Sequence, residues 1–396
     1  MRRKLIAALV LALFTSIIMA QTAAAGPYDS VFSQATFSTL VEFDKTEISA
    51  YEMRGFCSSA DGKYLFGGLL QDIRRVIKID AATGEPVGEY IDDEPGYPKG
   101  LCTDDRGYLN VGLANAPNNG SVGFSIVEVS SMNEVKFVST EIDGKVGVNG
   151  VAVAKLGDKY YLYVITNYDT DRLYRFDVTT PSNPVLDKSF GKSSGYTDLQ
   201  ELTGSAACDA NYLAVDSDGI IYMTAKVDNG SKGDTVLKIS ADGKSIITKT
   251  ALTEPYGVYL RDGYLLVSTY NGADSIVYVI KTSDLSAACE IGAMDDAARY
   301  SGVTIAGDRI YISDQGYGLG DRILVSSKLE FPAPQPETPP AVETPAEEPV
   351  SADVPVTANP APAPVITAAQ TGDYTMASVV LLAAASMALV ITRKRK

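Results

Sequence analysis

The amino-acid sequence predicts an all-β fold for residues 27–331, a six-bladed β-propeller closed by an N-terminal strand. The first observation is a unit that recurs six times, in which an apolar strand is followed by an Asp/Gly turn and a tyrosine-rich strand. The second is the spacing of the units, whose starts are separated by 45, 50, 62, 45 and 45 residues. A period of about 40 to 50 residues, built from four short strands, is typical of propeller blades.

Each unit opens with a residue pair at the start of its first strand. In chain order these pairs are Arg54-Gly55, Lys99-Gly100, Asn149-Gly150, Asn211-Tyr212, Tyr256-Gly257 and Ser301-Gly302. In five units a turn that contains aspartate follows the first strand. These turns lie at Asp61-Gly62, Asp105-Arg106-Gly107, Asp218-Gly219, Asp262-Gly263 and Asp308. Aspartate and glycine favour the tight turns that join antiparallel strands, so each unit is expected to form a hairpin-based sheet.

The sixth unit ends after Val325, one strand short of a complete blade. The segment Ala35 to Phe43 alternates polar and apolar residues as a strand does, and it has no blade of its own. We expect this segment to supply the missing outer strand and to close the ring without a large exposed edge. Two alternatives remain open: a seventh blade within the interval of 62 residues, and a β-sandwich.

The N-terminal segment, residues 1–25, has the three parts of a secretory signal peptide. A basic start precedes an apolar run from Leu5 to Ala20, and three alanines at 23–25 place cleavage before Gly26. The alternative is a retained N-terminal anchor. After the propeller, residues 332–367 are rich in proline and alanine, a composition that favours an extended, disordered stalk over a packed core.

The C-terminal segment, residues 368–396, combines an apolar run from about Tyr374 to Ile391 with four terminal cations. Such a run is just long enough to cross a membrane as a helix, with the cations on the cytoplasmic side. The dipeptide Thr371-Gly372 before it resembles the LPXTG-type sorting signal of Gram-positive surface proteins, although alanines stand where Leu-Pro belongs. The resemblance implies cleavage by a sortase between these two residues. The alternative is a retained transmembrane helix, and either places the propeller outside the cell, anchored to the cell wall or the membrane.

Composition excludes several functions. The net charge of −15 argues against nucleic-acid binding, which requires a basic surface. Because the chain has no histidine, a Ser-His-Asp triad, a Cys-His pair and a His-ligated zinc or haem are impossible. The four cysteines, Cys57, Cys102, Cys208 and Cys289, are too few for a disulfide framework, and the sequence does not decide whether any pair is bridged. It predicts no catalytic residue, no cofactor and no bound metal.

The repeated units resemble the blades of the NHL, YVTN and gluconolactonase-like propellers over residues 35–330. The gluconolactonase-type enzymes in this group hold a divalent metal in the channel with a glutamate, an asparagine and an aspartate that precede inner-strand glycines. By position these ligands fall on Arg54, Asn149 and Asn211, so only Asn149 agrees with the pattern. Arg54 and the equivalent Lys99 would bring positive charge to the metal position, whereas a hard cation requires carboxylates. An extracellular lactonase or hydrolase at the channel mouth is therefore the second interpretation.

The leading interpretation is a binding module for a polar ligand or protein partner. In propellers, the loops that precede the inner strands open on one face, and long loops on a rigid scaffold often bind ligands. The residues expected around this channel mouth are Arg54, Lys99, Asn149, Asn211, Tyr256 and Ser301, with Asn167 and Asp314 just outside it. Arg54 and Lys99 favour an anionic ligand. The alternatives are that acids such as Glu52 neutralise these cations, and that the chain is a structural surface protein.

Overall fold

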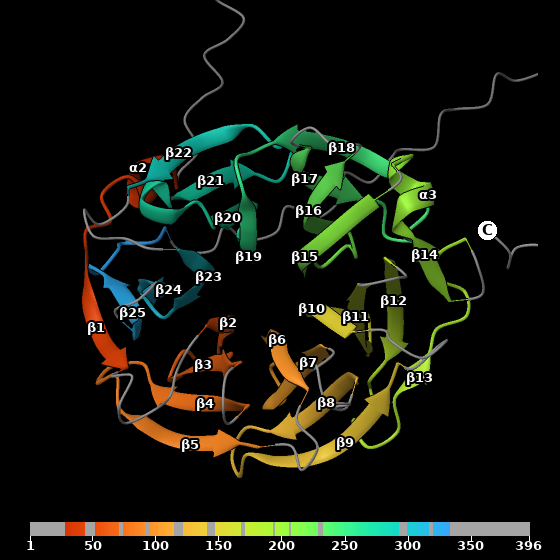
Figure 1. The fold of residues 1–396 in the computed structure, drawn as a ribbon, viewed down its shortest axis with the longest axis horizontal. Coiled ribbons are helices and arrows are strands. Elements are labelled where there is room, and N and C mark those ends of the chain that lie inside the picture. The colour runs from red at the N-terminus through yellow and green to blue at the C-terminus, as the bar shows by residue number, and fades with distance from the viewer. Residues whose placement is uncertain are drawn as a thin grey trace, which may run out of the picture. The chain divides into compact units, whose positions relative to one another are not determined.

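Six antiparallel sheets are arranged as blades around a central axis (Figure 1). The computed structural model describes residues 28–43, 52–70, 74–91, 96–114, 122–140, 147–167, 171–192, 195–205, 207–228, 233–292, 299–316 and 320–332. These residues belong to one unit, Met1–Pro336. The predicted signal peptide, the stalk, Thr371-Gly372 and the C-terminal anchor lie outside the described residues. In the described ranges no helix is long and apolar enough to span a membrane.

The blades follow one another in chain order, and each runs from an inner strand to an outer strand. Blade 1 is β2 (Met53–Ser58), β3 (Tyr64–Leu69), β4 (Arg75–Asp80) and β5 (Pro86–Tyr90), and blade 2 is β6 (Tyr97–Thr103), β7 (Tyr108–Ala114), β8 (Gly123–Glu128) and β9 (Asn133–Ser139). Blade 3 is β10 (Gly147–Leu156), β11 (Lys159–Asn167), β12 (Arg172–Asp177) and β13 (Val185–Leu186), and blade 4 is β15 (Ala207–Val215), β16 (Ile221–Asp228), β17 (Asp234–Ile239) and β18 (Ile246–Ala251). Blade 5 is β19 (Pro255–Arg261), β20 (Tyr264–Thr269), β21 (Val277–Lys281) and β22 (Ala287–Ile291), with the short helix η1 (Gly272–Asp274) between β20 and β21.

Blade 6 joins the two ends of the propeller. Its strands are β23 (Tyr300–Ala306), β24 (Arg309–Gly316) and β25 (Gly320–Ser326), and its outer strand is β1 (Phe37–Phe43), which follows helix α2 (Asp29–Phe32). β1 pairs with β25 in antiparallel register, from Phe37 opposite Ser326 to Phe43 opposite Asp321. The predicted six-bladed ring and its closure by the N-terminal strand are confirmed.

The interval of 62 residues contains an insertion rather than a seventh blade. Strand β14 (Tyr196–Asp198) pairs with β12 as a fifth strand of blade 3, and helix α3 (Leu199–Thr203) follows it directly. The Asp198 side chain accepts a hydrogen bond from the Glu201 amide, which caps this helix. The insertion brings α3 close to β15, and Figure 1 shows α3 near the rim of the ring, beside β14.

The glycines that open the blades allow the inner strands to approach closely. A Cβ atom on Gly150 would lie 2.6 Å from the Asn211 carbonyl oxygen in blade 4, and one on Gly302 would lie 2.6 Å from the Phe56 Cβ in blade 1. Real Cβ atoms essentially never approach so closely, so a side chain at either position would push neighbouring blades apart. Glycine at these two positions is thus required for the close approach of the neighbouring inner strands.

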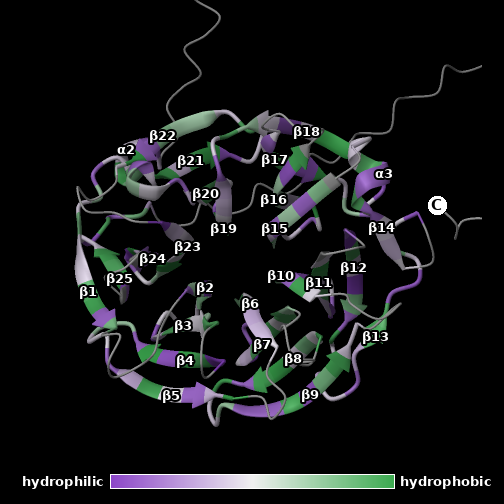
Figure 2. Ribbon diagram, viewed as in Figure 1, coloured by the Kyte–Doolittle hydropathy of each residue, from purple (hydrophilic) through white to green (hydrophobic). Residues whose placement is uncertain are grey.

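Hydrophobic side chains fill each of the six junctions between neighbouring blades. The described residues form one buried cluster per junction, and the cluster between blades 6 and 1 contains Phe43 of β1 together with Met53 and Ile323. Along the outer strand β18, partly buried and exposed residues alternate, so one face of the strand packs against the protein and the other faces solvent. Figure 2 shows this mixture of hydrophobic and hydrophilic residues in every blade.

Candidate functional site

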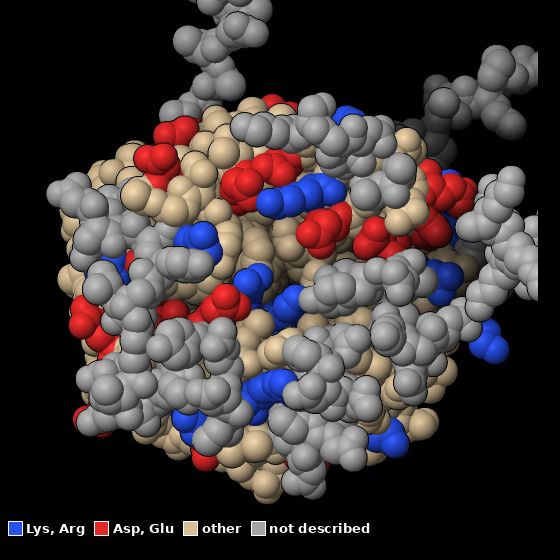
Figure 3. All heavy atoms as spheres, in the orientation of Figure 1, with Lys and Arg blue, Asp and Glu red and all other residues tan. Residues whose placement is uncertain are grey.

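A polar cavity of about 560 Å³ lies where the inner strands begin. The residues that line it come from blades 1 to 5 and from the insertion in blade 3: Arg54, Lys99, Asn149, Asp171, Gln200, Cys208, Asp209, Asn211, Tyr212, Lys226, Glu254, Tyr256 and Tyr270. Figure 3 shows basic and acidic side chains gathered around the centre of the face viewed in Figure 1. The cavity therefore has the size of a small-molecule site and a lining rich in charge.

Arg54 is the best-fixed cation of the cavity. Its Nη1 donates a hydrogen bond of 2.8 Å to the Tyr256 hydroxyl, and its guanidinium carbon lies 5.5 Å from the centre of the Tyr270 ring. Its Nη2 lies 3.1 Å from a Glu52 carboxylate oxygen, so for Arg54 the structure shows the acid partner that the alternative interpretation expected. The Arg54 side chain is 23% exposed and that of Glu52 is 37% exposed, and solvent weakens a pair in such a position. The positive charge of Arg54 is therefore only partly offset by Glu52.

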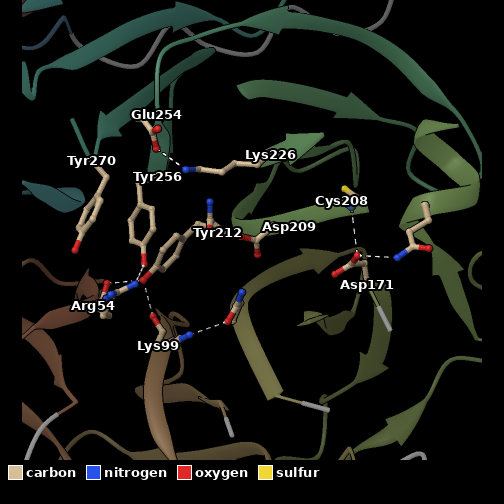
Figure 4. Close-up of a pocket in the computed structure, with 13 residues that line it drawn as sticks. Arg54, Lys99, Asp171, Cys208, Asp209, Tyr212, Lys226, Glu254, Tyr256 and Tyr270 are labelled. Carbon is tan, nitrogen blue, oxygen red and sulfur yellow. Dashed lines mark hydrogen bonds and ion pairs between the residues drawn. The ribbon is translucent and has the colours of Figure 1, made fainter. Parts of the chain in front are cut away.

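Lys99 lies beside Arg54, at the equivalent position of the next blade. Its Nζ is 3.4 Å from the Asn149 Oδ1, and the Asn149 Nδ2 donates to the Ala210 carbonyl at 3.1 Å. Asn149 thereby links the starts of β6, β10 and β15. Lys99 and Arg54 together form the cationic end of the cavity (Figure 4).

Tyr212 crosses the axis of the ring. Its hydroxyl donates to the backbone carbonyl oxygens of Arg54 and, at 2.8 Å, of Lys99, which belong to blades 1 and 2. Burial raises the pKa of this phenol well above its ordinary value, so the hydroxyl keeps the proton that it donates. Tyr212 occupies the position that is glycine in the five other units, and this departure is a signal that the sequence contained.

The acidic end of the cavity is formed by Asp171 and Asp209. The Asp171 Oδ2 accepts hydrogen bonds from the Gln200 Nε2 at 3.2 Å and from the Cys208 amide at 3.3 Å. Burial raises the pKa of the Asp171 carboxyl above its ordinary value, and the neighbouring Asp209 charge acts in the same direction. The exposed Asp209 extends from β15 toward the same space (Figure 4).

An ion pair joins blades 4 and 5 at the edge of the cavity, where the Lys226 Nζ lies 2.6 Å from a Glu254 carboxylate oxygen. Glu254 has a φ of 45°, and Glu52, which pairs with Arg54, has a φ of 71°. Left-handed backbone at residues other than glycine costs free energy and is concentrated at functional sites. Both strained residues stand two positions before the opening pair of a blade and hold a cation of this cavity.

Five of the eight predicted ligand-binding residues line the cavity: Arg54, Lys99, Asn149, Asn211 and Tyr256. Ser301 does not, because its side chain is fully buried and its hydroxyl donates to the Met53 carbonyl. Asp314 is also interior: it is 1% exposed and lies 2.8 Å from Arg322. Asn167 ends β11 opposite Gly147, and its side chain is outside the description. The sequence analysis did not single out the other polar lining residues, which are Asp171, Asp209, Glu254, Gln200, Tyr212, Lys226 and Tyr270.

The cavity does not have the donor set of a divalent-metal site. The positions that correspond to the metal ligands of gluconolactonase-type enzymes carry Arg54, Asn149 and Asn211, and Lys99 stands beside them. A hard cation would meet two positive charges there. Within the described ranges, no group of three or more Cys, Asp or Glu residues could hold a metal ion.

The four cysteines are free thiols. Burial raises the pKa of Cys208 to about 12 and that of Cys289 to about 11. Since the thiolate is the nucleophile, such thiols are unreactive at neutral pH. Cys208, which lines the cavity, is therefore a packing residue.

Comparisons with known proteins concern the fold. No family model matches the chain, and no curated protein matches it. Among solved structures, it is similar to the PQQ-bound aldose sugar dehydrogenase of Streptomyces coelicolor, with 15% identity, a TM-score of 0.48, and coverage of 75% of this chain and 99% of that one. A protein of unknown function from Bacteroides caccae gives 12% identity, a TM-score of 0.46, and coverage of 67% and 89%.

A third similar structure is the hydrazine synthase of Kuenenia stuttgartiensis, with 16% identity, a TM-score of 0.43, and coverage of 69% of this chain and 79% of that one. At these identities nothing about activity passes to the present chain. Its own strands define it as a six-bladed β-propeller. Its particular feature is a charged cavity at the openings of the inner strands.

Proposed function

We propose that this protein is a binding module that holds a polar ligand by an anionic group at Arg54 and Lys99. The observation that carries the proposal is the convergence of these two cations, from neighbouring inner strands, on one cavity of about 560 Å³. Tyrosine rings and the Tyr256 hydroxyl hold the guanidinium in place before a ligand arrives. Such preorganisation reduces the ordering cost of binding.

Substitution of Arg54 tests this proposal. In Arg54→Gln at least one charge-assisted hydrogen bond to an anion is lost, and one such bond contributes about 1.5 to 3 kcal/mol, so affinity should fall by at least roughly 10-fold to 150-fold. The measurement is calorimetric titration with a panel of small carboxylates, phosphate and sulfate at low salt. Binding of the wild type should also weaken as sodium chloride is added, since salt screens exposed charges.

The matched control is Arg261→Gln, which removes an arginine outside the cavity that pairs with Asp262. It should leave every affinity unchanged. If no anion of the panel binds, or if the two variants behave alike, the anion site is wrong.

We further propose that the propeller is displayed at the cell surface by its signal peptide, stalk and C-terminal anchor. The support for this proposal is the sequence: an export signal at one end, and Thr371-Gly372 with an apolar run and a basic tail at the other. A sortase-like cleavage would leave a mature chain that ends at Thr371.

Mass spectrometry of the mature protein, isolated from its native cells, identifies the C-terminal residue directly. The expected C-terminal peptide ends at Thr371, and Thr371→Ala should abolish the cleavage. A peptide that contains Gly372 and continues to Lys396 would contradict processing and would leave a retained membrane helix as the means of attachment.

A further inference from the structure

The cavity has a second charged end that the anion site does not use. Asp171 precedes β12 and Asp209 lies in β15, and both side chains face the space that Arg54 and Lys99 approach from the other side (Figure 4). Among the described residues, no hydrogen bond or ion pair involves the Asp209 carboxylate. The nearby cation Lys226 lies 2.6 Å from Glu254, and the charge of Asp209 contributes to the raised pKa of Lys226 without a direct ion pair between them.

Hydrogen bonds from two neighbouring elements fix the position of Asp171. Gln200, which donates to its carboxylate, belongs to α3, and the Cys208 amide that also donates belongs to β15. The Asp171 carbonyl in turn accepts from the Leu199 amide at the start of α3. The insertion in blade 3 thus holds this carboxylate at the wall of the cavity.

Besides burial, the charge of Asp209 raises the pKa of Asp171, so the two carboxylates repel each other, and part of this cost disappears when a positive group binds. An ammonium group can donate three hydrogen bonds and suits two carboxylate acceptors. The side-chain amide of Asn211 also lacks a partner. This residue lines the cavity and is 8% exposed, and its Nδ2 has no hydrogen-bond partner. Because buried donors normally have an acceptor, the unpaired Nδ2 indicates that a ligand supplies the acceptor.

We propose that the ligand is a zwitterion, with its carboxylate at Arg54 and Lys99 and its primary ammonium group at Asp171 and Asp209. This inference rests on the proposed anion site and names the chemical class that the whole cavity accepts. The body of the ligand lies beside the ring of Tyr212, which stands between the two charged ends, and the Tyr256 ring lies next to it with a centre 5.2 Å away (Figure 4). Amino acids and short peptides have this charge distribution.

The test uses the full chain and a series of unbranched ω-amino acids, from 4-aminobutanoate to 8-aminooctanoate. Each is compared in calorimetric titrations with the carboxylate and the alkylamine of the same length. At the length that matches the cavity, the amino acid should bind at least about tenfold more tightly than either single-charged compound, the gain of one charge-assisted contact. Asp209→Asn and Asp171→Asn should each remove this gain, and neither should weaken binding of the plain carboxylate, because each removes a negative charge from the cavity.

The exposed acid Glu290 lies outside the cavity, so Glu290→Gln is the matched control and should change nothing. Asp209→Asn alters an exposed side chain, so a loss in this variant does not come from misfolding. If amino acids bind no more tightly than carboxylates at every length, the zwitterion is wrong, while the anion site stands as long as Arg54→Gln weakens the carboxylate. If neither class binds, the proposed function fails as well.

Discussion

Deleting residues 28–43 should lower the free energy of unfolding by more than about 5 kcal/mol. The deletion removes β1, the outer strand of blade 6, and leaves the edge of β25 unpaired. It also removes Tyr28, Phe32 and Phe43, which are 6%, 0% and 3% exposed. Burial of each aromatic side chain contributes roughly 1.5 to 3 kcal/mol, and the lost strand hydrogen bonds add to this sum. Urea denaturation followed by circular dichroism measures the difference.

A peptide of residues 28–43 provides the positive control for this deletion. Added in excess, it should pair with β25 and restore part of the lost stability, because the closing strand is continuous in sequence. Ser38→Ala, at an exposed position of the same strand, should change the free energy of unfolding by less than about 0.5 kcal/mol. A deletion variant as stable as the intact chain would show that β1 does not close the ring.

The free energy of unfolding should also contain a contribution from Asp321 that decreases as pH rises from 4 to 7. Asp321 is 3% exposed, and its Oδ2 accepts a hydrogen bond of 2.8 Å from the Met53 amide. Burial, with the charges of Glu52 and Asp314, raises the pKa of its carboxyl from 3.8 to about 7. The folded chain therefore holds a proton in this range that the unfolded chain has lost. Stability falls with rising pH by roughly 3 to 4 kcal/mol.

Asp321→Asn isolates this contribution, because the asparagine oxygen can still accept from the Met53 amide while it carries no charge. The variant should be more stable than the wild type at pH 7, by up to about 4 kcal/mol, and no more stable at pH 4. Asp308→Asn, which removes an acid paired with Lys328 near the protein surface, is the control. Denaturation curves at pH 4, 5, 6 and 7 are required. A difference in stability between Asp321→Asn and the wild type that stays constant at all four pH values would contradict the assignment.

Most of the fold could be predicted from the sequence because a blade is built from strands that follow one another in the chain. Each blade needs a small residue where the inner strands approach, a tight turn and alternating strands, and all three signals are local. Gly219, for example, has a φ of 81° in the turn of blade 4, as its Asp-Gly pair predicted. The closing strand was recognisable because the sixth unit was one strand short.

The candidate site was predicted less completely because it depends on contacts between blades. Asp171, Gln200 and Asp209 meet only when blade 4 packs against blade 3 and the insertion in blade 3 folds against β15, and no spacing in the sequence indicates this. By their positions in the sixth unit, Ser301 and Asp314 correspond to site residues of the other blades. In the structure, however, Ser301 is bonded to the Met53 carbonyl and Asp314 is paired with Arg322, so both side chains are buried. Repeat position alone therefore identifies where a residue lies along the axis, but its neighbours decide which way its side chain points.

The tyrosine that crosses the axis also ties distant parts of the ring together. With its hydroxyl bonded to backbone oxygens of two blades across the ring, Tyr212 links blade 4 directly to blades 1 and 2. Any displacement of these blades relative to one another would therefore have to lengthen or break these hydrogen bonds.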